Sequence, residues 1–203
     1  MKRQKSKILK EIAETYIARV KNTEVSHKRL MLLFSGIPCT DKTYLAKKIE
    51  KRYHGIRLNS DEARKVIKKL GRQKYPELLN EKYKEEVLRY CLHQWITKYP
   101  FKNRLFILDK GIDRDFEDIS RLAKKAKFKI FLIRITSTKE NAEKGAMLKL
   151  GKPDRNFIEN IDRWVREYKK FGKTHKADIT IKNSLSKPIN TTILFQRLDK
   201  TVK

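Results

Sequence analysis

The sequence is poor in the residues that build covalent or metal-held scaffolds. Its 203 residues include two cysteines, Cys39 and Cys91, and four histidines that lie far apart. Two cysteines are too few for a disulfide framework. No histidine has another histidine or a cysteine at the spacing of a zinc site. No apolar run reaches the length of a signal peptide or a membrane span. We therefore expect a cytoplasmic protein with no disulfide scaffold, no zinc centre and no membrane contact.

Acidic residues are scarce as well, with 24 Asp and Glu against 51 Lys and Arg, a net charge of +27. Such an excess concentrates polyanions near a surface, so nucleic acid is a possible partner. The excess is diffuse: residues 1–30 carry nine basic and three acidic residues, and residues 64–104 carry twelve and four. A functional polyanion role and a general lysine bias remain equal alternatives.

The length fits one domain, and hydrophobic patterning divides it into an N-terminal amphipathic helix with a linker (1–28) and a main domain (29–203). We interpret the helix as packed on the body, with partner binding as the alternative. Short apolar runs predict strands at 30–34, 56–58, 105–108, 130–135 and 177–181. Helical periodicity predicts helices at 5–20, 44–53, 60–70, 76–98, 116–126, 138–171 (interrupted at GKPD) and 188–200, with Ser60 as a cap.

This alternation of strands and helices predicts an α/β fold: a doubly wound, mainly parallel five-stranded sheet flanked by helices. In such a fold the ligand lies beyond the carboxyl ends of the strands. The residues that follow the predicted strands are therefore the candidates for a site.

One such segment, GIPCTDKT, follows the first predicted strand and precedes a helix. It matches the pattern Gly-x-x-x-x-Gly-Lys-[Ser/Thr], in which backbone N–H groups cradle phosphates, the lysine reaches the outer phosphates and the hydroxyl holds Mg²⁺. Gly36, Lys42 and Thr43 match, but Asp41 replaces the second glycine. Two unit charges about 4 Å apart repel by about 4 kcal/mol at a dielectric of 20, so Asp41 predicts weaker ATP binding. We expect Lys110 to compensate by pairing with Asp41.

The chain resembles the P-loop kinases that include polynucleotide kinases, zeta toxins and proteins labelled AAA-family ATPases, here with a degenerate Walker A loop. The resemblance spans about residues 29–183 and rests on GIPCTDKT, LNSDEARKVI, LFILDKGIDRDFEDI, KIFLIRITSTKENAEK and HKADITIKN. It implies a P-loop NTPase fold with ATP and Mg²⁺ as cofactors. The whole loop would bind the nucleotide: Gly36, Ile37, Pro38, Cys39, Thr40, Asp41, Lys42 and Thr43.

The resemblance also implies individual roles. Lys42 would contact the β and γ phosphates, while Thr43 and Asp109 would hold Mg²⁺. Asp61 would orient the acceptor hydroxyl, and Arg64 would hold a polar group of the acceptor. The alternative for Ser60 and Asp61 is an ordinary helix N-terminus. Asp113 and Arg114 would border the acceptor site.

Kinases of this group close a lid whose arginines neutralise the transferred phosphoryl group. The corresponding region, about 138–172, has Lys144, Gly145 and Lys149 at the expected arginine positions, and its first arginine is Arg155, followed by Arg163 and Arg166. Two functions remain open. One is an ATP-dependent kinase acting on a hydroxyl of a nucleic-acid end, nucleotide or related small molecule; the other is a pseudokinase that serves as a basic RNA- or protein-binding module.

Overall fold

The computed structural model of the chain describes residues 2–18, 28–76, 86, 89–90, 93–94, 105–151, 155–184 and 189–202. Its strands are β1 (Leu30–Ser35), β2 (Ile56–Asn59), β3 (Leu105–Gly111), β4 (Lys129–Thr136) and β5 (Ile179–Lys182). Its helices are α1 (Lys2–Ile17), α2 (Lys42–Tyr53), α3 (Ser60–Gln73), α5 (Phe116–Lys125), α6 (Lys139–Leu150), α7 (Arg155–Thr174) and α8 (Thr192–Val202). The helix predicted over 76–98 lies largely outside the described residues.

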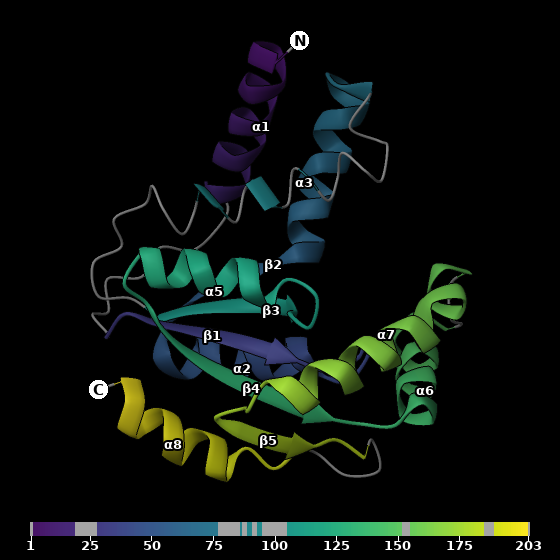
Figure 1. Ribbon diagram of the computed structural model, residues 1–203. Helices are drawn as coiled ribbons and strands as arrows, with labels where there is room; N and C mark the ends of the chain where they lie inside the picture. The colour runs from purple at the N-terminus through teal and green to yellow at the C-terminus, as the bar shows by residue number, and fades with distance from the viewer. Residues whose placement is uncertain are drawn as a thin grey trace.

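The five strands form one parallel sheet in the order β2-β3-β1-β4-β5. Strand β1 lies at its centre, and all six of its residues are buried, as the continuous apolar run LMLLF predicted. The predicted fold class, an α/β sheet of parallel strands with helices on both faces, is confirmed. In Figure 1 the carboxyl ends of the strands point towards α6 and α7.

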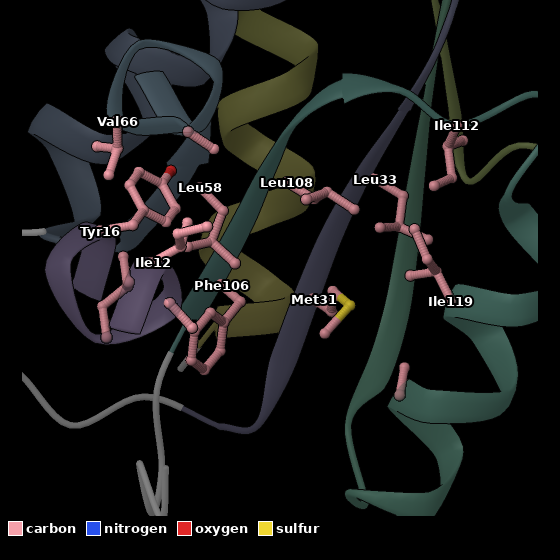
Figure 2. Close-up of a cluster of buried hydrophobic side chains, with 14 of the residues drawn as sticks. Ile12, Tyr16, Met31, Leu33, Leu58, Val66, Phe106, Leu108, Ile112 and Ile119 are labelled. Atoms are coloured by element: carbon pink, nitrogen blue, oxygen red, sulfur yellow. The ribbon is translucent and has the colours of Figure 1, made fainter. Parts of the chain in front are cut away.

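Each face of the sheet has its own core. Alternate β1 side chains point to opposite faces: Met31 and Leu33 pack with α1, α3 and α5, whereas Leu30, Leu32 and Phe34 pack with α2 and α8. Figure 2 shows the first of these cores, in which side chains of β1, β2 and β3 meet those of the helices.

The N-terminal helix belongs to the first core. Ile12 is 1% exposed, and the Tyr16 hydroxyl donates to the backbone oxygen of Asn59 at 3.0 Å and accepts from its N–H at 2.9 Å. The interpretation of α1 as a packed helix is confirmed, and it stands beside α3 in Figure 1. Tyr16 thereby fixes the backbone at the end of β2, where the site begins.

The cap of α3 and several element boundaries differ from the sequence predictions. Asn59, rather than Ser60, caps α3: its side-chain oxygen accepts from the N–H groups of Asp61 and Glu62, both at 2.9 Å. The last strand begins at Ile179 instead of Ala177, a shift within the usual uncertainty of element boundaries. None of the described helices is both long and apolar enough to span a bilayer.

Candidate functional site

The site centres on the loop between β1 and α2, residues 36–43, which we call the phosphate loop. Gly36 has φ 154°, and a Cβ there would lie 3.1 Å from the Ile135 backbone oxygen. A side chain here would strain the backbone and would require the Ile135 carbonyl to shift, so glycine is favoured. The Thr40 hydroxyl donates to the Ile37 carbonyl at 2.8 Å and closes the loop on itself.

Asp41 adopts the left-handed conformation that a glycine would take, with φ 63° and ψ 21°. Asp is one of the few non-glycine residues that tolerate this region. Although Asp41 occupies the N-cap position of α2, its carboxylate makes no capping hydrogen bond. Instead the Asn183 side-chain amide donates to Asp41 Oδ2 at 3.0 Å. The carboxylate is therefore held by the end of β5 and leaves the amides of the first α2 turn uncapped.

The prediction that Lys110 pairs with Asp41 was wrong. The Lys110 ammonium pairs with Asp115, at the start of α5, and not with Asp41. Lys110 follows Asp109 in β3, and Asp115 is close because the chain turns directly into α5. The neutral amide of Asn183 is the partner that the structure gives to Asp41.

Lys42 folds back over the phosphate loop. Its ammonium donates to the carbonyls of Gly36 at 2.9 Å and Ile37 at 2.5 Å. Burial lowers the pKa of Lys42 to about 8, although the nearby charges of Asp113 and Asp109 oppose the fall. A bound anion would add to the negative charge near Lys42 and favour its charged form, so this lysine is suited to a phosphate.

Asp109 ends the apolar part of β3 and lies beneath the loop with its side chain 1% exposed. The Thr43 hydroxyl donates to its Oδ1 at 2.9 Å. Its Oδ2 accepts from Asn59 Nδ2 at 2.6 Å and from Arg57 Nη1 at 2.8 Å. Asn59 is opposite Asp109 in the β2–β3 register, which explains why the two side chains meet. The hydroxyl and the carboxylate that were predicted to share a metal are thus in contact.

The acceptor-side candidates lie at the start of α3. Arg64 Nη1 contacts Asp61 Oδ1 at 3.2 Å, one turn along the helix, and the Asp61 side chain is 60% exposed. Asn59 links this turn to the loop, because its amide binds Asp109 while its oxygen caps α3. The Asp61 side chain is therefore open to solvent, and Asn59 connects its backbone to Asp109 on the phosphate side of the site.

Asp113 lies nearer to the loop than its sequence position suggested. The Ser35 hydroxyl donates to Asp113 Oδ1 at 2.5 Å, and the Gly36 N–H donates to Oδ2 at 3.2 Å. Asp113 therefore binds the first residue of the loop. Its negative charge also acts on Lys42 and raises the pKa of that lysine. Arg114 points elsewhere and pairs with Glu167 of α7 at 3.4 Å.

Helix α6 lies directly on the phosphate loop. A Cβ at Gly145 would be 2.3 Å from the Cys39 carbonyl oxygen, so glycine is required for this approach. Ile37 is buried with Ala142 and Ala146 of α6 and with Phe157 of α7 in a third apolar cluster. The predicted lid segment is therefore packed on the loop through its own core.

The cations of this segment do not converge as an arginine lid would. Arg155 is 91% exposed and pairs with Glu159 at 2.6 Å, and Arg163 pairs with Glu167 at 3.8 Å. Lys149, at the end of α6, is the lid cation whose charge acts on Lys42. The role of Arg155 stays a prediction.

The fit to Mg²⁺ is uneven. The Thr43 hydroxyl, which donates its proton to Asp109, keeps lone pairs that suit Mg²⁺. Asp109 already receives three hydrogen bonds, one of them from a guanidinium. In the described part of the chain, no three His, Cys, Asp or Glu side chains gather as a metal site. A metal here would be held by Thr43 and by the phosphates themselves.

Three contributors were not singled out from the sequence: Arg57, Asn59 and Asn183. Each follows from a signal that is present. Arg57 is a charged residue inside a buried strand and so requires a partner, while Asn59 and Asn183 stand at or just after strand ends, where ligand sites are built. The contacts that bring them to the site are distant in the sequence: Arg57 and Asn59 bind Asp109, and Asn183 binds Asp41 across 142 residues.

No family model and no curated protein matches the sequence. Solved structures do resemble it. A chain from the PezAT chromosomal toxin–antitoxin system of Streptococcus pneumoniae superposes with a TM-score of 0.58 at 11% identity, covering 99% of this chain and 87% of the other. A putative kinase from Chloroflexus aurantiacus gives 0.55 at 13% identity, covering 87% and 99%. A gluconokinase from Sinorhizobium meliloti gives 0.50 at 8% identity, covering 79% and 84%.

Sheet order and structural neighbours together show that the chain has a P-loop NTPase-like α/β fold. At these identities the likeness concerns the fold alone. What the site does depends on its own residues.

The contact between α6 and the loop yields a stability prediction. In an ordinary helix Gly→Ala stabilises by about 0.5–1 kcal/mol. At Gly145 the added methyl meets the Cys39 backbone, and overpacking of this kind costs about 1–3 kcal/mol. We expect Gly145→Ala to lower the free energy of unfolding in urea, whereas Lys144→Ala, at the exposed neighbouring position, changes it by under about 0.5 kcal/mol. A more stable Gly145→Ala protein would contradict the packing.

Proposed function

We propose that the protein is a phosphotransferase that binds a nucleoside triphosphate at the phosphate loop. It transfers the terminal phosphoryl group to a hydroxyl of a nucleic-acid end, a nucleotide or a related small molecule. The observation that carries the proposal is the position of Asp41: its carboxylate is turned to Asn183 and does not cap α2, so the N-terminal amides of that helix remain for the phosphates.

The remaining loop residues support phosphate binding. Lys42 can exchange its two carbonyl partners for phosphate oxygens, because both lie within the loop that would surround the triphosphate. Thr43 is the side chain that would hold Mg²⁺, which supplies charge neutralisation between the outer phosphates when bound. Lys149 adds positive charge on the lid side, without the bidentate geometry of arginine.

Phosphoryl transfer requires an oriented hydroxyl more than covalent catalysis. In the proposed reaction the acceptor oxygen forms a bond to the terminal phosphorus, and the bond from that phosphorus to the bridging oxygen breaks. The acceptor proton passes to the Asp61 carboxylate, and the nucleoside diphosphate leaves. Arg64 holds Asp61 in position and carries the charge for a polar group of the acceptor.

Nucleotide affinity tests the proposal through Asp41 and Asn183. Calorimetry with ATP should detect binding by the native protein and a gain of about 10- to 100-fold for Asp41→Gly, because a charge near the phosphates is removed. Asn183→Ala should weaken binding about tenfold by freeing the Asp41 carboxylate to cap α2. In the Asp41→Gly background the same Asn183→Ala change should have little effect, which is the signature of coupling.

Lys42→Ala is the control that should abolish binding in every background. If neither the native protein nor Asp41→Gly binds ATP, the proposed function is wrong. The pseudokinase alternative, a basic binding module, would then be favoured by RNA affinity that falls steeply with salt. Two observations support this alternative: Asp41 is exposed in the phosphate loop, and the lid residues Arg155 and Arg163 pair with glutamates.

The lowered pKa of Lys42 makes binding pH-dependent. Below pH 8 its ammonium is charged, so affinity for ATP should be constant; above pH 8 the free protein loses this proton and affinity should fall by up to tenfold per pH unit. Lys42→Arg keeps its charge throughout this range and should show no such fall, whatever its absolute affinity. A flat profile for the native protein between pH 7 and 9.5 would count against Lys42 as the phosphate ligand.

A further inference from the structure

Arg57 lies on β2, an edge strand of the sheet, and three carboxylates surround its guanidinium. Its guanidinium donates to Glu50 of α2 at 2.7 Å, to Glu62 of α3 at 2.9 Å and to Asp109 of β3 at 2.8 Å. Its side chain is 9% exposed. One buried residue therefore connects the helix after the phosphate loop, the helix of the acceptor side and the strand beneath both.

Of these three pairs, the one with Asp109 is the most strongly shielded from water. The Glu50 and Glu62 side chains are 33% and 47% exposed, whereas Asp109 is 1% exposed. Charges attract more strongly where water is excluded, and a buried carboxylate without its partner is costly. Burial opposes the charge on Arg57, but the hydrogen bonds to the three carboxylates outweigh it and raise the pKa of Arg57 above its ordinary value.

The contacts of Asp109 leave little capacity for a metal or for the waters around one. Oδ1 accepts from Thr43, and Oδ2 accepts from Asn59 and Arg57. A carboxylate has about four lone-pair sites, so three are used. A divalent cation near Asp109 would also face the fixed positive charge of Arg57, which attracts the same oxygen and repels the cation.

We infer that Arg57 neutralises Asp109 in place of a metal, so that Asp109 positions Thr43 and β2 but binds no Mg²⁺. Thr43 is then the one protein ligand proposed for Mg²⁺, so the metal adds little to the affinity for the nucleotide. The inference rests on the proposed function, since it concerns the nucleotide at the phosphate loop. Arg57 is a positioning residue in this account: it acts through Asp109 and does not touch the phosphates.

The first experiment uses the native protein and calorimetry with ADP, in excess Mg²⁺ and in EDTA. The inference expects dissociation constants that agree within about threefold. A loss of thirtyfold or more in EDTA would overturn it while leaving the proposed function intact. Absence of binding in both conditions, for the native protein and for Asp41→Gly, would overturn the proposed function and the inference with it.

The second experiment removes the arginine charge. Arg57→Gln leaves the Asp109 carboxylate without its cation, so Mg²⁺ should now tighten ADP binding by at least about tenfold relative to EDTA. The matched control is Arg52→Gln in α2, which also removes one arginine charge. Arg52 pairs with Asp199 and is 49% exposed. For this variant the ratio of the ADP dissociation constants in EDTA and in Mg²⁺ should equal that of the native protein. A ratio near one for folded Arg57→Gln would overturn the role of Arg57, and if that variant does not fold the native ratio alone decides.

Discussion

The buried carboxylate of Asp109 is the point on which the whole site depends. Its two oxygens receive bonds from Thr43 at the start of α2 and from Asn59 and Arg57 of β2. Through Asn59 and Arg57 it also determines where α3 begins, since these residues cap that helix and pair with Glu62. Removing one partner of a buried ion pair leaves an uncompensated charge, at a cost of about 3–5 kcal/mol, so Asp109 requires its cationic partner. The phosphate loop and the start of α3 are therefore both held by contacts with Asp109.

In the phosphate loop, Asp41 combines a left-handed backbone with a charged side chain. Asp41 keeps the left-handed backbone of a glycine, and its charge is moved from the helix terminus by Asn183 at the end of β5. Helix α6 closes over the loop at Gly145, where no side chain is tolerated. The loop is thus held by contacts with β3, with Asn183 and with α6.

Much of the fold could be predicted because burial on both faces leaves a simple signal. The runs at β1, β3 and β4 are continuous and apolar, and the placement of GIPCTDKT after β1 identified the loop. Asp109 was singled out as a possible Mg²⁺ ligand because it is a carboxylate at the end of an apolar strand. The partner of Asp41 was not predictable, since a contact across 142 residues depends on sheet order and strand register, which local patterns do not contain. The pairing of Lys110 with Asp115 depends instead on the path of the turn between β3 and α5.

The central claim is that the phosphate loop still binds a triphosphate despite Asp41. A crystal structure with a non-hydrolysable ATP analogue tests it most directly. The account predicts the outer phosphates at the N-terminus of α2, with Lys42 moved from its two loop carbonyls onto them and Asp41 still bonded to Asn183. Crystals soaked to saturation in which Lys42 keeps its loop partners, and in which Asp41 caps α2 where the phosphates belong, would contradict it.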